Sequence, residues 1–129
     1  MSRINAFLEL LIKQGGSDLH MVSGNQPRMR LHGEIHPIKY RELNERETEF
    51  LLFEIMSARH QAHLEQYGGV DFAYELEGQA RFRVNVYRHQ GGIGAVFRSI
   101  PHAVQTLDEL KLPPVLKSLA RQRKGLILV

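Results

Sequence analysis

Alternating apolar and polar residues in the second half of the chain constrain its fold more than any other feature. Apolar side chains occupy every second position in Val70–Leu76 and in Phe82–Val86, and a further apolar stretch covers Ile93–Ile100. Glycines at 78 and 92 mark the turns between these stretches. Because successive side chains of a strand point to opposite faces, the pattern predicts an antiparallel meander of three strands with one buried and one polar face.

The first third of the chain reads as a helix followed by short strands. Apolar residues from Ile4 to Ile12 recur at the spacing of one helical stripe, and Gly15 is positioned to end the helix. Asp18–Val22 then alternates as a strand. Arg28–His36 also alternates, with Gly33 interrupting it, which indicates either one half-buried strand or a tight hairpin.

Two helices are expected before the meander. Asn44 and Glu47 have the spacing of a capping box, in which each side chain satisfies a free backbone N–H at the helix start. Ser57 is a candidate cap for the second helix, which should end at Gly68. The apolar residues of the first of these helices that are expected to be buried are Phe50, Leu51, Phe53, Ile55 and Met56. Together these elements predict an α+β fold, an antiparallel sheet with helices packed against it.

The last part of the chain changes character. Thr106 with Glu109 forms a second capping-box pattern, and a helix beginning after Pro114 should turn Val115 inward. The final run Leu126–Val129 is continuously apolar, as in a strand buried on both faces of a parallel sheet. It is either a frayed edge strand of the first sheet or, as we favour, the first strand of a further domain. We therefore divide the chain into residues 1–101, the sheet domain, and 102–129, connecting helices and that strand.

Composition excludes several classes of protein. With 129 residues, 43% of them hydrophobic, the chain suits one domain with a substantial core. It has no cysteine, which excludes disulfides and cysteine-based metal sites. No apolar run approaches the roughly 20 residues that span a bilayer, and no secretory signal is evident, so a cytoplasmic location is expected. The net charge of +3 permits anionic partners without selecting one.

Five stretches carry a resemblance to a known family. They are Ser17–His20, Arg30–Gly33, Arg81–Asn85, Gly94–Pro101 and Gly125–Val129. In this order and spacing they resemble the N-terminal domain of type IV pilus retraction ATPases, the PilT family within the type II/IV secretion ATPase superfamily. The last stretch resembles the strand that leads into the family's phosphate-binding loop, so the chain reads as truncated just before that loop.

The resemblance implies a fold and a function. The fold would be PAS-like, and the 102–129 segment would lead into a RecA-like catalytic domain. The intact protein would be a hexameric ATPase of pilus retraction and twitching motility, using ATP and Mg²⁺ at the cytoplasmic face of the inner membrane. Its partners would be neighbouring subunits, its own C-terminal RecA-like domain and the inner-membrane platform protein of the pilus, with no nucleic acid.

Two departures limit that resemblance. His32 stands where the family usually has aspartate, which puts any role of that carboxylate in doubt. The sequence also has no G-x-x-x-x-G-K-[ST] pattern and therefore no phosphate cradle of its own. This chain alone is therefore expected to need no cofactor and to hydrolyse no ATP.

Three arginines are the candidate site. Arg81 and Arg83 share one face of their strand, and Arg98 lies on the strand expected beside it. A guanidinium group meets phosphate oxygens two at a time and keeps its charge. The ordinary interpretation is that these arginines face solvent, in which case removing each side chain lowers the free energy of unfolding by less than about 0.5 kcal/mol. The resemblance instead implies that Arg83 and Arg98 point at nucleotide phosphates in the full-length protein, with Arg81 as a further binding residue.

Two polar pairs suggest other chemistry. Asp18 and His20 share a strand face, either as an acid–base pair or, as we favour, as a polar face that fixes the edge of the domain, because no nucleophile accompanies them. His60 and His63 have helical i, i+3 spacing, but two ligands make a weak metal site. We therefore expect no metal here, and a solvated helix face instead.

Three hypotheses remain open. The chain is an arginine-supplying domain of a motor ATPase, a stand-alone PAS-like module for a small ligand, or a nucleic-acid-binding module on the basic face around Arg81 and Arg83. The third lacks aromatic side chains among the basic residues, with Tyr87 alone expected on that face. The second leaves the final apolar run unexplained.

Overall fold

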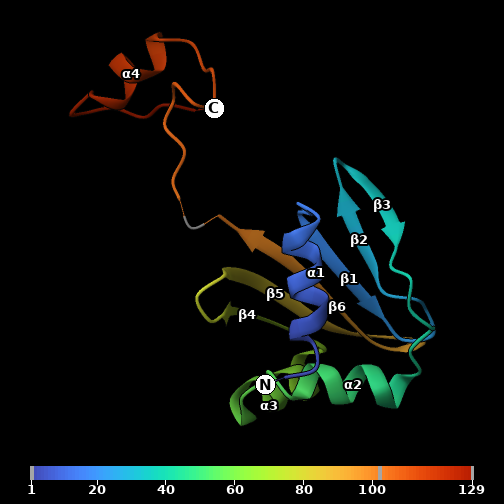
Figure 1. Cartoon of the computed structure of the whole chain (residues 1–129). Helices are drawn as coiled ribbons and strands as arrows, with labels where there is room; N and C mark the ends of the chain where they lie inside the picture. Colours follow the sequence, from blue (N-terminus) through green and yellow to red (C-terminus); the bar gives the residue numbers. More distant parts are fainter. Residues whose placement is uncertain (1, 102, 129) are drawn as a thin grey trace.

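The computed structural model describes residues 2–101 and 103–128. In chain order its elements are α1 (Asn5–Lys13), β1 (Asp18–Val22), β2 (Arg28–Leu31), β3 (Glu34–Pro37), α2 (Glu45–Phe53), α3 (Ala58–Tyr67), β4 (Gly69–Leu76), β5 (Ala80–His89), β6 (Gly92–Ile100) and α4 (Val115–Ala120). The strands form one antiparallel sheet of six in the order β3-β2-β1-β6-β5-β4. Helices α1, α2 and α3 cover one face of it (Figure 1). The predicted α+β fold is confirmed.

The predicted meander is the larger half of the sheet. Strands β4, β5 and β6 pair in sequence order through the predicted turns, and Gly78 and Gly92 adopt the positive φ angles, 71° and 123°, that glycine tolerates. Strand β1 lies between β2 and β6 and pairs with both. Asp18 and His20 therefore sit inside the sheet, and the expectation that they fix an edge is wrong.

The two alternatives for residues 28–36 resolve into a tight hairpin. Leu31 and Glu34 are paired, and the two residues between them, His32 and Gly33, have φ angles of 49° and 88°. Two consecutive left-handed residues are typical of the type I′ two-residue hairpin turn, whose twist matches that of the strands. His32, where the family usually has aspartate, is therefore a turn residue of this hairpin.

The core lies between the three helices and the apolar face of the sheet. Phe82 and Phe97, on neighbouring strands, are fully buried, as are Leu8 and Leu11 of α1 and Leu52 of α2. Fully burying an apolar side chain of this size contributes about 1.5–3 kcal/mol. This one-sided burial leaves the opposite face of the sheet to polar residues.

Both expected helix starts are present. In α2 the Asn44 side chain accepts from the Glu47 amide, and the Glu47 carboxylate accepts from the Asn44 amide, each at 3.0 Å. In α3 the Ser57 hydroxyl accepts from the His60 amide at 3.2 Å, and Gly68 closes the helix with a φ of 75°.

The expected burial of Phe50 is wrong. The buried stripe of α2 consists of Thr48, Leu51 and Leu52, at i, i+3 and i+4, so Phe50 falls beside the stripe. Its side chain is 53% exposed.

Residues 103–128 differ most from expectation. The Thr106–Glu109 capping box forms, with the Glu109 amide donating to the Thr106 hydroxyl at 3.2 Å, but it caps a single turn that ends at Lys111 with a φ of 53°. Helix α4 forms after Pro114, yet it has no buried residue and Val115 is 57% exposed, because no sheet lies against it (Figure 1).

The final apolar run forms no strand over residues 126–128, so the alternative of a frayed edge strand of the first sheet is wrong. Leu126 and Leu128 are more than four-fifths exposed, and the predicted strand's last residue, Val129, lies outside the described residues. Within the described ranges, no helix has the length and apolarity to cross a membrane.

Candidate functional site

A row of charged side chains crosses the polar face of the sheet. Arg30 of β2 pairs in register with Asp18 of β1, Asp18 with Arg98 of β6, and Arg98 with Arg83 of β5. Directly paired residues project to the same face of an antiparallel sheet. The register therefore brings three arginines and one aspartate into a line on the face that the helices leave uncovered.

Asp18 is the anchor of this row. Its side chain is only 6% exposed, and it accepts hydrogen bonds from the Ser17 hydroxyl at 2.8 Å and from the Arg98 Nε at 3.0 Å. Arg30 approaches the second carboxylate oxygen at 3.5 Å. Burial alone would raise the pKa of Asp18, but the hydrogen bonds from Ser17 and Arg98 outweigh it and leave that pKa below its ordinary value. Asp18 is thus ionised at neutral pH and holds Arg98 in place.

Arg83 and Arg98 lie on neighbouring strands, as the sequence predicted, and the register places them directly opposite each other. Their side chains are 68% and 69% exposed. Arg83 has a looser counterion, Asp71, whose carboxylate oxygen lies 3.6 Å from its Nε. With Asn85 and Val96 these residues line a hollow of about 230 Å³. Like charges directly opposite repel, and here each of the two arginines has a carboxylate counterion, Asp71 for Arg83 and Asp18 for Arg98.

Arg81 stands apart from this hollow. It lies two residues before Arg83 in β5 and pairs with Ile100 of β6 and with Glu75 of β4. The structure therefore brings together two of the three predicted arginines around one hollow and leaves Arg81 on the same face at its side.

His20 shares the open face with Asp18, as predicted. Burial is the main cause that lowers the pKa of His20, which is therefore neutral at neutral pH. Its Nε2 is buried and has no hydrogen-bond partner among the described residues. Asp18 binds Arg98 and Arg30 rather than orienting this imidazole toward a nucleophile, so the geometry does not support an acid–base pair.

The two helix histidines do not converge on a metal. His60 stacks on Phe72 with ring centroids 4.5 Å apart, and the His63 Nδ1 lies 3.1 Å from the Gly69 carbonyl oxygen. No group of three His, Asp or Glu side chains in residues 2–101 and 103–128 is arranged to hold a metal ion. Packing of His60 against the sheet, which the sequence did not predict, explains its position.

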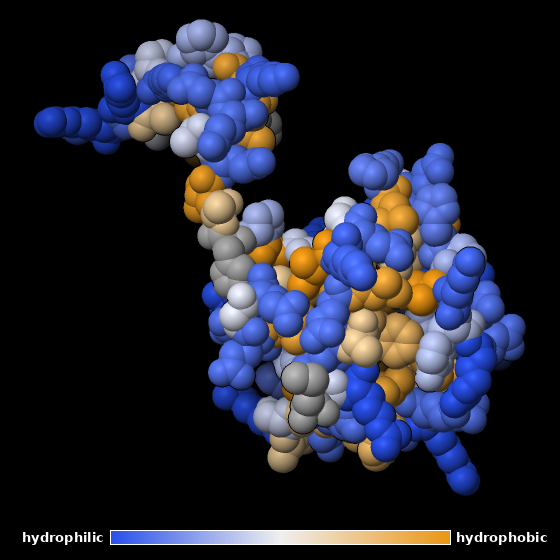
Figure 2. Space-filling view, in the orientation of Figure 1, coloured by the Kyte–Doolittle hydropathy of each residue, from blue (hydrophilic) through white to orange (hydrophobic). Residues whose placement is uncertain are grey.

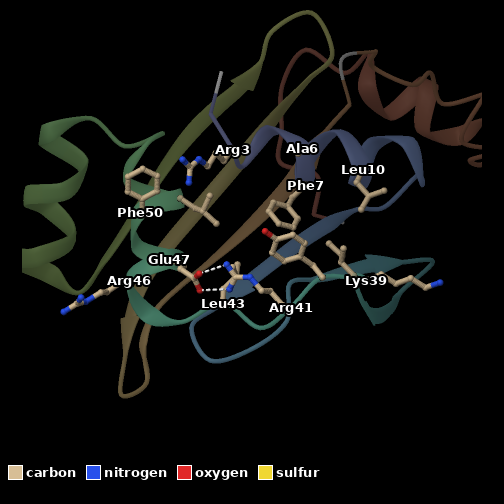
Figure 3. Close-up of a pocket in the computed structure, with 13 residues that line it drawn as sticks. Arg3, Ala6, Phe7, Leu10, Lys39, Arg41, Leu43, Arg46, Glu47 and Phe50 are labelled. Atoms are coloured by element: carbon tan, nitrogen blue, oxygen red, sulfur yellow. Dashed lines mark hydrogen bonds and ion pairs between the residues drawn. The ribbon is translucent and has the colours of Figure 1, made fainter.

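A second hollow was missed at the level of sequence. A groove of about 590 Å³ runs between α1, α2 and the loop 38–43, as Figure 3 shows. Phe7 and Tyr40 meet edge to face on its floor, with ring centroids 5.1 Å apart, and Phe50 lines its wall. The signal in the sequence was an apolar residue, Phe50, displaced from the helical stripe beside Leu51 and Leu52.

Comparison with known proteins identifies relatives of this chain. No protein-family model matches the chain. The type IV pilus retraction ATPase PilT of Pseudomonas aeruginosa is 37% identical over 126 residues, 98% of this chain and 37% of that protein. The type IV pilus ATPase PilU of the same organism is 32% identical, over 94% of this chain and 32% of that protein.

A solved structure agrees with these relatives. The pilus retraction motor PilT, in a structure with bound ADP, superposes with a TM-score of 0.80 and 32% identity, over 92% of this chain and 35% of that one. The chain thus spans about a third of the length of the relatives it matches.

Proposed function

We propose that this chain, an N-terminal domain of the PilT family of ATPases, places Arg83 and Arg98 against the phosphates of a nucleotide in the full-length protein. The observation that carries the proposal is the direct pairing of these two exposed arginines on the uncovered face of the sheet. Both sit on a rigid sheet, where a backbone ladder rather than a mobile loop sets their spacing.

The ion pairs leave donors for a ligand. The contacts to Asp18 and Asp71 run through the Nε atoms of Arg98 and Arg83. A guanidinium carries five N–H donors, four of them on its terminal nitrogens, which remain to donate to phosphate oxygens in the hollow. Such a pair can neutralise charge that develops during phosphoryl transfer. Arg81, at the side of the hollow, is proposed as a weaker phosphate contact.

The rest of the site belongs to the full-length protein. ATP and Mg²⁺ would be held by its catalytic domain, because the described residues contain no acidic cluster for a metal and the sequence has no phosphate-binding loop. The bound ADP of the solved relative supports a nucleotide as ligand. We further propose a homohexamer in which this domain packs on a neighbouring subunit, driving pilus retraction and twitching motility beside an inner-membrane platform protein on the cytoplasmic side.

The test compares arginine variants in the full-length enzyme. Arg83→Ala and Arg98→Ala should each lower ATPase turnover at least about tenfold, which is 1.4 kcal/mol in the barrier. Arg59→Ala on α3, on the helix-covered side, is the matched control and should leave turnover unchanged. Hexamer assembly is followed by size-exclusion chromatography with light scattering. Normal turnover in both assembled variants would refute the arginine role.

The isolated chain provides a second check. It should neither turn over ATP nor bind it tightly, because it has no phosphate-binding loop. Isothermal titration calorimetry with ATP and Mg²⁺ measures this directly. A dissociation constant in the micromolar range would show a complete nucleotide site within this chain. It would contradict the proposal that the catalytic domain of the full-length protein holds the nucleotide and that this domain only contributes arginines.

A further inference from the structure

We propose that Asp18 is a positioning residue for the nucleotide reaction, because its carboxylate holds the guanidinium of Arg98 in the direction that meets phosphate oxygens. The inference rests on the proposed function of Arg98 and deepens it. Asp18 lies on the open face of the sheet, but its side chain is 6% exposed and offers almost no surface to a ligand. Figure 2 shows the helix-covered side of the sheet domain, where apolar side chains reach the surface among hydrophilic ones. A charged ligand therefore suits the open face, where Asp18 and Arg98 pair.

The backbone around Asp18 is fixed by the strands on both sides. The Ser17 amide donates to the Arg30 carbonyl oxygen of β2 at 3.0 Å, and the Ser99 amide of β6 donates to the Ser17 carbonyl oxygen at 2.9 Å. Asp18 itself is in register with Arg30 on one side and with Arg98 on the other. The position of the carboxylate is therefore set by a backbone ladder before any ligand arrives.

The direction of the carboxylate is fixed as well. Its Oδ1 accepts from the Arg98 Nε at 3.0 Å, whereas its Oδ2 accepts from the Ser17 hydroxyl at 2.8 Å and lies 3.5 Å from the Arg30 Nε. Arg30 is held in turn by the Gly33 carbonyl oxygen, to which its Nη1 donates at 2.9 Å. Because Ser17 and Arg30 occupy one oxygen, the other stays directed at Arg98. Two arginines share one carboxylate, so the group keeps a net positive charge toward a phosphate.

Arg83 has no comparable support, although it lies directly opposite Arg98. Its counterion Asp71 is 54% exposed, lies 3.6 Å away and belongs to β4, at the edge of the sheet. An exposed pair of this kind restrains its side chains weakly. A group that is fixed in advance needs no reorganisation during the reaction, whereas a mobile side chain must first be ordered. Asp71 is therefore the matched control for Asp18.

Steady-state kinetics of the full-length enzyme test the role of Asp18. Asp18→Asn keeps the size of the side chain and removes its charge. Because a charge-assisted hydrogen bond is roughly twice as strong as a neutral one, we expect kcat to fall about fivefold, about 1 kcal/mol in the barrier. The KM for ATP should change less than about twofold, as for an interaction made mainly in the transition state. Asp71→Asn should change kcat less than about twofold. An unchanged kcat in assembled Asp18→Asn would overturn the inference.

Combined variants separate positioning from a general weakening of the fold. In an Arg98→Ala background, Asp18→Asn should lower kcat less than about twofold, because no guanidinium remains to be positioned. In an Arg83→Ala background the fall should stay at about fivefold. Equal falls in the two backgrounds would indicate a structural role and overturn the inference.

A further combination tests charge balance. Asp18→Asn leaves Arg30 and Arg98 without their shared counterion, and adding Arg30→Gln removes one of these two cations. The double variant should keep the lowered kcat of Asp18→Asn, because Arg98 still lacks its charged acceptor. Return of kcat to the parent value would show that repulsion between the arginines, rather than the lost direction of Arg98, had slowed the reaction, and would refute the role of Asp18.

The pose of Arg98 is also measurable without turnover, in the 129-residue chain. Nitrogen-15 NMR relaxation of the arginine Nε–H groups should show less side-chain motion for Arg98 than for Arg83, and Asp18→Asn should remove that difference. Equal mobility of the two arginines in the parent chain would overturn the inference.

The two proposals fail in different ways. Normal turnover in Arg98→Ala would refute the role of Arg98 at the nucleotide, and with it the positioning role of Asp18. Lowered turnover in Arg98→Ala together with normal turnover in assembled Asp18→Asn would refute only the role of Asp18. Lowered kcat in both, with the loss in Asp18→Asn confined to backgrounds that retain Arg98, is the expected result.

Discussion

Removal of Arg98 should destabilise the fold, whereas removal of Arg83 should not, although both are exposed arginines on neighbouring strands. The difference lies in their counterions. Arg98 donates at 3.0 Å to Asp18, a carboxylate that is 6% exposed, whereas Arg83 lies 3.6 Å from Asp71, which is 54% exposed. An unpaired buried charge is costly, but an unpaired surface charge is hydrated by water.

The magnitudes follow from these contacts. A hydrogen bond to a charged group contributes about 1.5–3 kcal/mol. Arg98 is itself largely exposed, and Arg30 and Ser17 continue to contact Asp18, so we expect Arg98→Ala to lower the free energy of unfolding by about 1–2 kcal/mol. Arg83→Ala should cost about 0.5 kcal/mol or less. The sequence had indicated the smaller value for both.

Urea denaturation of the 129-residue chain measures the difference. Both variants should keep the m-value of the parent, so that the midpoint shift reports stability. A double-mutant cycle with Asp18→Asn isolates the pair: the effect of Arg98→Ala should largely vanish in that background, and the effect of Arg83→Ala should not. Equal destabilisation by the two arginine changes, or no coupling between positions 18 and 98, would refute the reasoning.

Three further outcomes are expected. Acid should destabilise the chain below about pH 4. The pKa of Asp18 is lower in the folded than in the unfolded chain, so the ionised carboxylate stabilises the fold at pH values above its unfolded pKa, and this contribution is lost as the pH falls toward its folded pKa. Asp18→Asn should flatten this part of a curve of stability against pH. Truncation after Gly125 should leave the thermal midpoint within about 1 °C, because the described residues removed are exposed, and it should reduce self-association seen by light scattering at high concentration; a large fall would place them in the core. Phe82→Ala should cost about 3–5 kcal/mol in urea denaturation, and a cost under about 1 kcal/mol would contradict its place at the centre of the core.

Local patterns were sufficient for most of the elements. The two-residue alternation of Val70–Leu76 and Phe82–Val86 predicted the meander, because a strand displays this period wherever one face is buried. The capping boxes at Asn44 and Thr106 both form. Only the first begins a helix, because Leu51 and Leu52 have a sheet to pack on, whereas the residues after Thr106 do not.

The candidate site was predicted in part. Arg83 and Arg98 were placed on adjacent strands from their alternation alone. Their direct pairing follows from the register of the β5–β6 hairpin. The role of Asp18 as the carboxylate that holds Arg98 depends on the position of β1 beside β6, some 80 residues apart in the chain. No local pattern encodes the pairing of β1 with β6.

The sequence by itself determined the strand and helix periods, the turn positions and the polar character of one sheet face, because these depend on neighbouring side chains and on glycine. Tertiary structure alone decided which charges meet across the sheet, and that Phe50 is left exposed on the wall of the groove between α1 and α2. Both outcomes depend on how the helices and strands pack against residues distant in sequence, which local periodicity does not specify.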